Sequence, residues 1–146
     1  MQIIKDNFIV DDTWQMIADD ETLPIGDICV SLARWQQEKP QLLHRSGRLG
    51  ICLQPADDVM ALADDVKHFA LIALDFPDFA DGRAFSQAKL LRERLGYNQE
   101  LRAMGHYMPD QAFYLSRVGV NAFAPEKFTD IPVMLAKLHA FSVSYQ

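Results

Sequence analysis

The stretch FALIALDFPDFADGR, from Phe69 to Arg83, decides how the rest of this chain is interpreted. Its first part, Ala70 to Leu74, is an unbroken apolar run without the alternation of a strand that wets one face. Such a run is typical of a strand buried on both faces in the middle of a parallel sheet. The chain turns polar at Asp75 and then enters a helical pattern. Ligands of open α/β sheets bind outside the carboxyl ends of the strands, so we expect a functional site there.

Strand and helix patterns alternate on both sides of this stretch. A hairpin is predicted at the N-terminus, where Asp6-Asn7 suits a tight two-residue turn. Apolar runs then predict five strands, and helical spacing predicts five helices. The strands are expected over residues 28–30, 49–53, 70–74, 101–104 and 120–123, and the helices over residues 31–38, 57–69, 82–95, 109–118 and 131–138.

Connections this short predict direct crossovers between parallel strands. The chain is therefore predicted to be a single α/β domain, residues 1–146, with a mostly parallel five-stranded open sheet, helices on both faces and the N-terminal hairpin. A partial βα barrel, completed by dimerisation into a homodimer, is the alternative, because alternation alone does not separate the two architectures.

Composition excludes several classes of protein. The chain is 49% hydrophobic and 23% charged, as is ordinary for a soluble globular domain, and no apolar run approaches the ~20 residues of a membrane span. The first residues lack the pattern of a secretory signal, and Cys29 and Cys52 are isolated in apolar runs. We therefore expect a cytoplasmic protein with reduced, buried cysteines.

The net charge of −6 is distributed unevenly. Residues 1–81 carry 15 acidic and 6 basic side chains, a net −9, whereas residues 82–146 carry 5 acidic and 8 basic ones, a net +3. An acidic chain is a poor nucleic-acid binder, because phosphate contacts dominate that affinity. A local basic region can hold a small anion or an acidic partner surface, although salt bridges to the acidic half are the simpler explanation.

Two groups at the strand ends are candidates for catalysis. Asp75 ends the buried strand, where a carboxylate can act as a base, a metal ligand or a hydrogen-bond anchor. His106 follows the strand over residues 101–104 and falls in the same layer as Asp75 if both strands are parallel. An Asp–His pair across neighbouring strand ends suits acid/base chemistry. The alternatives are a carboxylate that fixes loop amides and a histidine that is merely solvated.

A second set of residues is predicted to bind an anionic small molecule or a partner protein. Arg83 lies in the first turn of a helix, where its charge opposes the helix dipole and needs an anion or a nearby carboxylate such as Asp81. Arg102 interrupts an apolar strand, so it must be paired, with Glu100 and Glu93 as candidate partners, or reach solvent. The full set is Phe76, Asp81, Gly82, Arg83, Gln87, Arg102, Asp110 and Gln111.

Metal and cofactor motifs are weak or absent. Asp75, Asp78 and Asp81 are close enough in sequence to suggest Mg²⁺, but Asp81 before Gly82 is better explained as a helix cap, so no metal site is predicted. There is no glycine-rich dinucleotide loop, no phosphate-binding loop and no nucleophile elbow. A flavin can bind at a sheet switch point without a sharp motif, so the sequence leaves the cofactor unknown.

Several segments resemble one bacterial family. They are DFPDFADGR at residues 75–83, SQAKLLRER at 86–94, ELRA at 100–103 and DQ at 110–111. The family is catalogued as a domain of unknown function and is often labelled an oxidoreductase, and the resemblance extends over essentially the whole chain. Its members are commonly encoded beside assimilatory sulfite reductase, which implies a role in sulfate assimilation with sulfite reductase as the partner.

Two functions remain as hypotheses. In the first, the chain is a non-redox accessory protein of sulfite reduction that docks on a partner through the mixed-charge surface of residues 83–117 and exposed aromatics such as Phe76, Phe79 and Tyr107. In the second, it is a small enzyme or ligand-binding protein that acts on an anionic small molecule at the strand ends. The accessory role is preferred because the catalytic constellation is incomplete, and the phenylalanines alternatively belong to the core.

Overall fold

The computed structural model describes residues 1–78 and 80–144, and it contains one sheet of eight strands. The strand order is β2-β1-β8-β7-β6-β5-β4-β3. The hairpin strands β1 and β2 are antiparallel, β1 is also antiparallel to β8, and the strands from β3 to β8 are parallel. The strands are β1 (Gln2–Lys5), β2 (Phe8–Asp11), β3 (Gln15–Met16), β4 (Ile28–Ser31), β5 (Leu49–Leu53), β6 (Leu71–Phe76), β7 (Glu100–Gly105) and β8 (Ala122–Pro125).

The predicted hairpin is confirmed, and it lies at the edge of the sheet. Asp6 and Asn7 both have positive φ, 51° and 68°, which is what a tight turn between two antiparallel strands requires. Ile4 of β1 pairs with Phe123 of β8, so the beginning of the chain lies beside its last strand. The buried run over Ala70 to Leu74 forms β6, which lies between β5 and β7.

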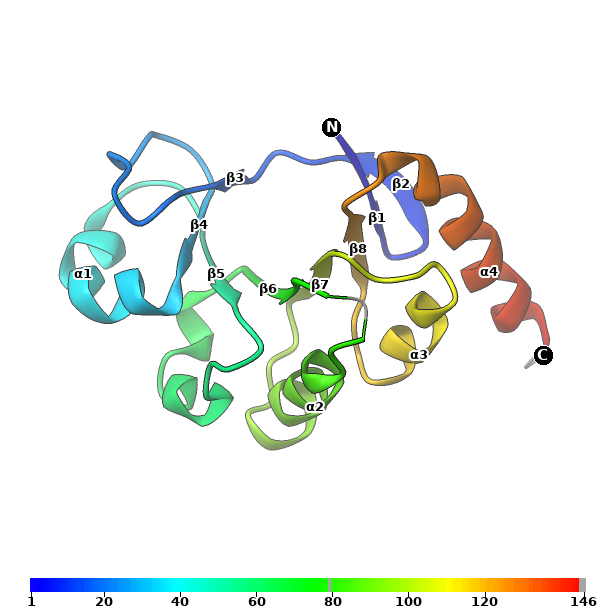
Figure 1. Ribbon diagram of the computed structural model, residues 1–146. Helices are drawn as coiled ribbons and strands as arrows, with labels where there is room; N and C mark the ends of the chain where they lie inside the picture. Colours follow the sequence, from blue (N-terminus) through cyan, green and yellow to red (C-terminus); the bar gives the residue numbers. More distant parts are fainter. Residues whose placement is uncertain (79, 145–146) are drawn as a thin grey trace.

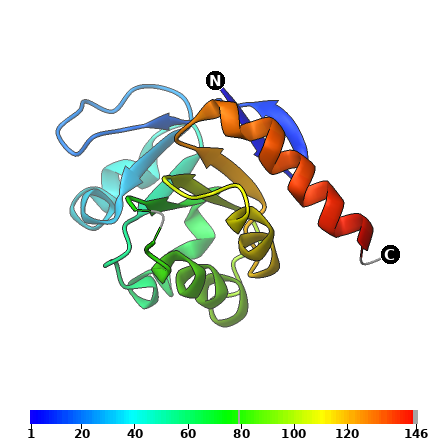
Figure 2. The ribbon, with the colours of Figure 1, turned by 45° about the vertical axis from the view of Figure 1, so that its right-hand side comes forward.

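The helices lie on the outer side of the curled sheet (Figures 1 and 2). Strands β3 to β8 follow one another in chain order, so successive right-handed crossovers place their connections on the same face. The α-helices are α1 (Leu32–His44), α2 (Arg83–Lys89), α3 (Gln111–Arg117) and α4 (Ile131–Ser144), and α2 continues into a π-helical turn, η3 (Leu90–Arg94). Among the described residues, no helix combines the length and apolar character needed to cross a membrane.

This arrangement corrects the first prediction of the architecture. The five predicted strands are joined by the two strands of the predicted hairpin and by β3, which was not predicted, and the sheet is curled into a half-barrel instead of lying open with helices on both faces. The partial βα barrel, which alternation could not distinguish from an open sheet, is the architecture observed. The difference lies in the strand order, because an open doubly wound sheet reverses its order at a switch point and this sheet does not.

Two predicted helices also differ from the structure. Residues 57–69 form two short 3₁₀ turns, η1 (Val59–Leu62) and η2 (Val66–His68), because aspartates in this segment bond to backbone amides and compete with helix formation. The helix predicted over residues 31–38 continues through Pro40 to His44 as α1. The helix bends at Glu38, where φ is −120°, and Pro40 then lies in the first turn after the bend, where its missing amide is tolerated.

A short segment explains why the sheet curls. Strand β2 lies at one edge of the sheet and β3 at the other, yet only Asp12, Thr13 and Trp14 connect them. Four peptide steps span at most about 14 Å. Seven strand spacings in a flat sheet span about 33 Å. The two edges must therefore approach one another, and residues 12–14, hereafter the strap, cross the open side of the half-barrel.

The strap packs into the concave face. Trp14 is buried against Cys29 and Leu71, and a side chain added at Gly50 would lie 3.2 Å from its ring. The guanidinium of Arg48 lies 5.0 Å from the centre of the same ring. These contacts fill the half of the concave face where the parallel strands begin.

We expect Trp14→Ala to lower the free energy of unfolding by about 3–5 kcal/mol, because it removes a large buried ring and leaves a cavity that the curled sheet cannot close. Urea denaturation measures the change. Ile25→Ala is the control, because Ile25 is 90% exposed and its loss should change stability by less than about 0.5 kcal/mol. A loss below about 1 kcal/mol for the Trp14 variant would contradict a stabilising role of the strap.

Candidate functional site

The carboxyl ends of β6, β7 and β8 are tied together in one layer. Asp75 is aligned with Met104 and Phe76 with Gly105 across the parallel pair β6–β7. The amide of His106 donates to the carbonyl of Phe76 at 2.7 Å, and the amide of Glu126 donates to the carbonyl of Gly105 at 2.8 Å. The parallel alignment on which the predicted Asp75–His106 pair depended is therefore present, and their catalytic role stays a prediction.

Gly105 permits this close approach. Its φ is +98°, and an added Cβ would lie 2.5 Å from the carbonyl oxygen of Phe76 and 2.8 Å from Oδ1 of Asp75. A side chain at this position would collide with both groups, in addition to the strain of a positive φ. Glycine thus lets the carboxylate of Asp75 lie directly beside the end of β7.

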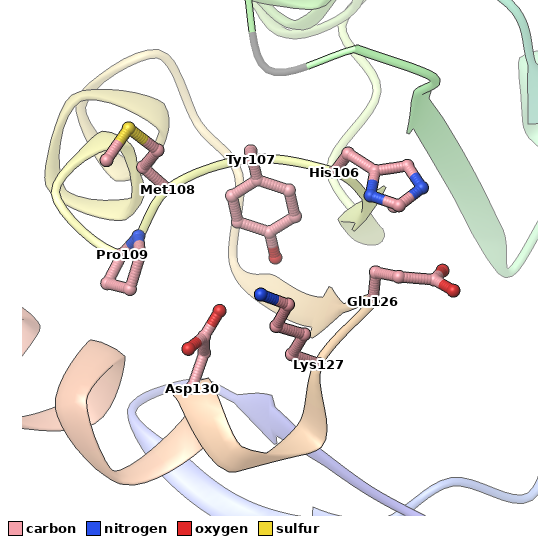
Figure 3. A pocket seen from close by; sticks show the side chains of 8 residues that line it. His106, Tyr107, Met108, Pro109, Glu126, Lys127 and Asp130 are labelled. Atoms are coloured by element: carbon pink, nitrogen blue, oxygen red, sulfur yellow. The ribbon is translucent and has the colours of Figure 1, made fainter.

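A cavity of about 250 Å³ opens between the loops that follow β7 and β8 (Figure 3). The loop after β7 supplies a buried aromatic ring and an exposed methionine, and the loop after β8 supplies charged side chains that project toward it. We call this surface the rim, and it consists of Gly105, His106, Tyr107, Met108, Pro109, Glu126, Lys127 and Asp130.

The aromatic residues under the rim belong to the core. Phe76 is fully buried, and its ring lies 5.2 Å from that of Tyr107. The hydroxyl of Tyr107 donates to the carbonyl of Ala103 at 3.0 Å, and burial raises the pKa of Tyr107 well above its usual value. Phe76 and Tyr107 therefore cannot be the exposed aromatics of a docking surface, because both rings are buried in the core at the end of the sheet. Phe79 lies outside the described residues.

Arg83 and Asp81 neutralise one another at the start of α2. The guanidinium Nη2 of Arg83 lies 2.6 Å from Oδ2 of Asp81, and the same carboxylate accepts the backbone amide of Arg83 at 3.0 Å. These hydrogen bonds lower the pKa of Asp81 to about 2. The carboxylate of Asp81 thus offsets the unfavourable charge of Arg83 in the first turn of the helix. Of the two explanations considered, a bound anion or a nearby carboxylate, the structure shows the carboxylate. Gly82 lies between them with open space around it.

Gln87 and Arg102 are buried and hold parts of the fold together. The side-chain amide of Gln87 donates to the carbonyls of Gln54 at 2.9 Å and Asp57 at 3.2 Å, which ties α2 to the loop after β5. Arg102 is 1% exposed, and its guanidinium lies 2.7 Å from Glu100 and 3.1 Å from Asp12. Glu100 was a predicted partner, whereas Asp12 comes from the strap and could not be foreseen from local sequence.

The last two predicted residues connect α3 to its surroundings. Asp110 pairs with Lys137 of α4 at 2.6 Å. The side-chain oxygen of Gln111 accepts the amide of Met108 at 2.8 Å and so fixes the loop that carries the rim. The structure therefore brings His106, Asp110 and Gln111 to one loop region, while Arg102 and Gln87 lie in separate buried networks.

A second cavity, of about 310 Å³, lies on the concave face and was not predicted. Sulfur atoms are prominent in its wall, which includes Met16, Cys29, Cys52 and Met104, and the thiol of Cys52 lies 4.0 Å from the thioether of Met104. Both cysteines are free, as predicted. Cys29 and Ser31 are two residues apart in the sequence, as are Cys52 and Gln54, so each pair lies on one face of its strand. This spacing was the sign of the cavity in the sequence, but it can be interpreted only when the concave face of the sheet is known.

The thiols are poor nucleophiles in this setting. Burial raises the pKa of Cys52 to about 12, with a further contribution from the carboxylate of Asp75, and burial raises the pKa of Cys29 well above its usual range. Within residues 1–78 and 80–144, no group of three or more His, Cys, Asp or Glu side chains could hold a metal ion.

Fold and site together define this protein as an α/β half-barrel with a small cavity at the carboxyl ends of its strands. The chain belongs to the bacterial protein family of unknown function DUF934, whose sequence profile matches residues 50–146. The match begins within β5, so it includes the rim but not the hairpin, and it is shorter than the whole-chain resemblance that was expected. A search of curated proteins gave no match.

Alkaline pH should destabilise the fold. A thiol whose pKa is raised by folding keeps its proton longer than in the unfolded chain, where it titrates near about 8.5, so the free energy of unfolding falls between about pH 9 and pH 12. The urea midpoint measured with reductant at pH 7, 9 and 10.5 should decrease, and Cys52→Ala should decrease less steeply than the unaltered protein. A midpoint that is constant over this range would contradict the burial of the thiols.

Proposed function

We propose that this protein is a non-catalytic accessory protein of assimilatory sulfite reduction, which docks on sulfite reductase through the rim. The observation that carries the proposal is the internal pairing of the groups best suited to bind a substrate. Arg83 is paired with Asp81, Arg102 with Glu100 and Asp12, and Asp110 with Lys137. Arg102 is buried and would lose this pairing if it bound a ligand, and the charge of Arg83 is already offset by Asp81, so both are poor candidates for an anion site.

The shape of the rim also favours protein docking over substrate binding. Pockets for small molecules typically enclose about 300–1,000 Å³. The rim cavity, at about 250 Å³, is below that range. Apolar surface from Met108 and Pro109 at one end of the rim adjoins the polar side chains of His106, Glu126 and Lys127, and protein interfaces likewise combine apolar and polar surface. Sulfite reductase as the partner follows from the family resemblance, and the charges of both signs predict a partner surface of mixed charge.

The alternative is a small enzyme or ligand-binding protein that acts on an anionic small molecule at the strand ends. One observation favours it: His106 and Lys127 line the same cavity from opposite loops, and neither forms an ion pair with another described residue. Asp75, whose carboxylate lies next to Gly105 of the rim, would then act as a base. This function requires the two basic groups to hold an anion next to the acidic Glu126 and Asp130.

Binding of the purified protein to purified assimilatory sulfite reductase, measured by biolayer interferometry, tests the docking role. We expect Met108→Asp to weaken binding at least about tenfold, because it places a charge on the apolar part of the rim. Met60→Asp is the matched control. Met60 is 43% exposed and Met108 52% exposed, but Met60 lies in η1 outside the rim, so its variant should bind normally.

Two results would contradict the proposal. Absence of binding by the unaltered protein would exclude sulfite reductase as the partner, and normal binding by Met108→Asp would exclude the rim. A rise in melting temperature with sulfite or sulfate, lost in both His106→Ala and Lys127→Ala, would instead support the alternative.

A further inference from the structure

The two edges of the curled sheet are protected to very different degrees. Strand β3 is only two residues long, and the side chain of Gln15 is bonded to the carbonyl of Ile25. Strand β2 is four residues long and exposed throughout, with Phe8 72% exposed, Ile9 41% and Val10 36%. Natural edge strands usually avoid unwanted pairing by being short, charged or covered. The only charge of β2 is Asp11 at the end, and the three apolar residues before it are neither charged nor covered.

The hydrogen-bond pattern of the hairpin shows which backbone groups of β2 face outward. The amide of Asp12 donates to the carbonyl of Met1 at 2.8 Å. Hydrogen-bonded positions alternate along an antiparallel pair, so Val10 and Phe8 bond to β1, while Ile9 and Asp11 direct their amides and carbonyls away from it. Among the described residues, no backbone hydrogen bond occupies these outward groups of Ile9 and Asp11.

An apolar groove runs beside this edge on the outer face. It has a volume of about 610 Å³, and Ile9 forms one side of it. Phe128, which is 71% exposed, also lines it together with the start of α4. The remaining lining residues are Met1, Gln2, Thr129, Ile131 and Pro132. Contiguous exposed apolar surface of this kind marks an interaction site.

We propose that β2 pairs with β2 of a second copy of this chain, antiparallel and with the two-fold axis at Ile9. The two Ile9 residues then exchange both backbone hydrogen bonds, because their amides and carbonyls already face outward. In this register Phe8 lies opposite Val10 of the partner subunit, so apolar side chains meet on both faces. The adjacent grooves of the two copies come together at the same axis.

The match of apolar residues selects this register over its neighbours. Acidic residues flank the apolar centre of β2, with Asp6 before it and Asp11 and Asp12 after it. An axis at Ile9 places apolar residues opposite apolar residues and Asp11 opposite the neutral Asn7 of the partner subunit, whereas an axis at Phe8 or Val10 would place an apolar residue opposite an aspartate. The Ile9 axis also brings Asp6 and Asp12 opposite one another beyond the ends of the strand, where Asp12 is already paired with Arg102. A self-complementary strand of this kind suits a two-fold interface, in which the same surface serves both copies.

The strap determines what such a dimer can look like. It already crosses the open side of the half-barrel, so a second copy does not complete the barrel as the sequence alone suggested. Pairing at β2 instead extends the sheet from one copy into the next. This inference does not depend on the proposed docking function, because the rim and the β2 edge share no residue.

Sedimentation equilibrium of the full chain, from micromolar to submillimolar concentration, tests the dimer. We expect twice the mass of the chain for the unaltered protein and a monomer for Ile9→Lys, which puts two lysines opposite one another at the axis. Ile25→Lys is the matched control, because Ile25 is 90% exposed and lies away from β2, so this variant should stay dimeric. Circular dichroism checks that both lysine variants are folded.

Disulfide formation tests the register independently. Directly opposed residues of a hydrogen-bonded pair have Cα atoms about 5.5 Å apart, within disulfide reach. Ile9→Cys should therefore form an intersubunit disulfide under mild oxidation, whereas Asp11→Cys should not, because the two copies of residue 11 lie about 13 Å apart in this register. A monomer at every concentration, a dimer that survives Ile9→Lys, or cross-linking of Asp11→Cys but not Ile9→Cys would each overturn the proposal.

Discussion

The length of the strap is the constraint on which the rest of the structure depends. Three residues cannot connect the two edges of a flat eight-stranded sheet, so the connection between β2 and β3 forces the sheet to curve. Curvature then separates an outer face, which the helices cover, from a concave face. Trp14 occupies the concave face where the strands begin, and the cavity lined by Cys52 and Met104 lies on the same face. One connection thereby determines which side chains share an environment.

Charge in this protein is used mainly to hold the chain together. Arg102 joins the strap to β7 through Asp12 and Glu100, and Lys5 of the hairpin also reaches Glu100. A buried arginine with two carboxylates costs desolvation, and its removal would leave uncompensated charges. In residues 82–146, Arg83 and Arg102 are held by carboxylates of the acidic part of the chain, and Lys137 is held by Asp110 of its own part. That is why the basic segment offers fewer free cations to a ligand than its composition suggested.

Local features were predictable from sequence to the extent that local chemistry determines them. The turn at Asp6-Asn7 and the buried strand β6 each depend on a few neighbouring residues. The curl of the sheet depends on strand order, which no local pattern encodes. Phe76 illustrates the limit for the site: its position at a strand end suggested exposure, but the ring points to the helix side and packs against Tyr107 and Phe85. Whether Phe76 is buried depends on which alternate residues of β6 face the helices, and the local sequence does not specify that.

The pairing of Ile4 with Phe123 has a consequence for how the chain folds. The hairpin is formed by neighbouring residues and can assemble early, within microseconds for an isolated hairpin. Its place in the sheet, however, is beside the last strand, so during synthesis it waits for β8 to emerge. Until β8 is synthesised, the strap keeps the hairpin close to the strands that precede β8 in the chain. Long-range contacts of this kind raise the contact order and slow folding, and the exposed apolar residues of β2 are available to other chains throughout that interval.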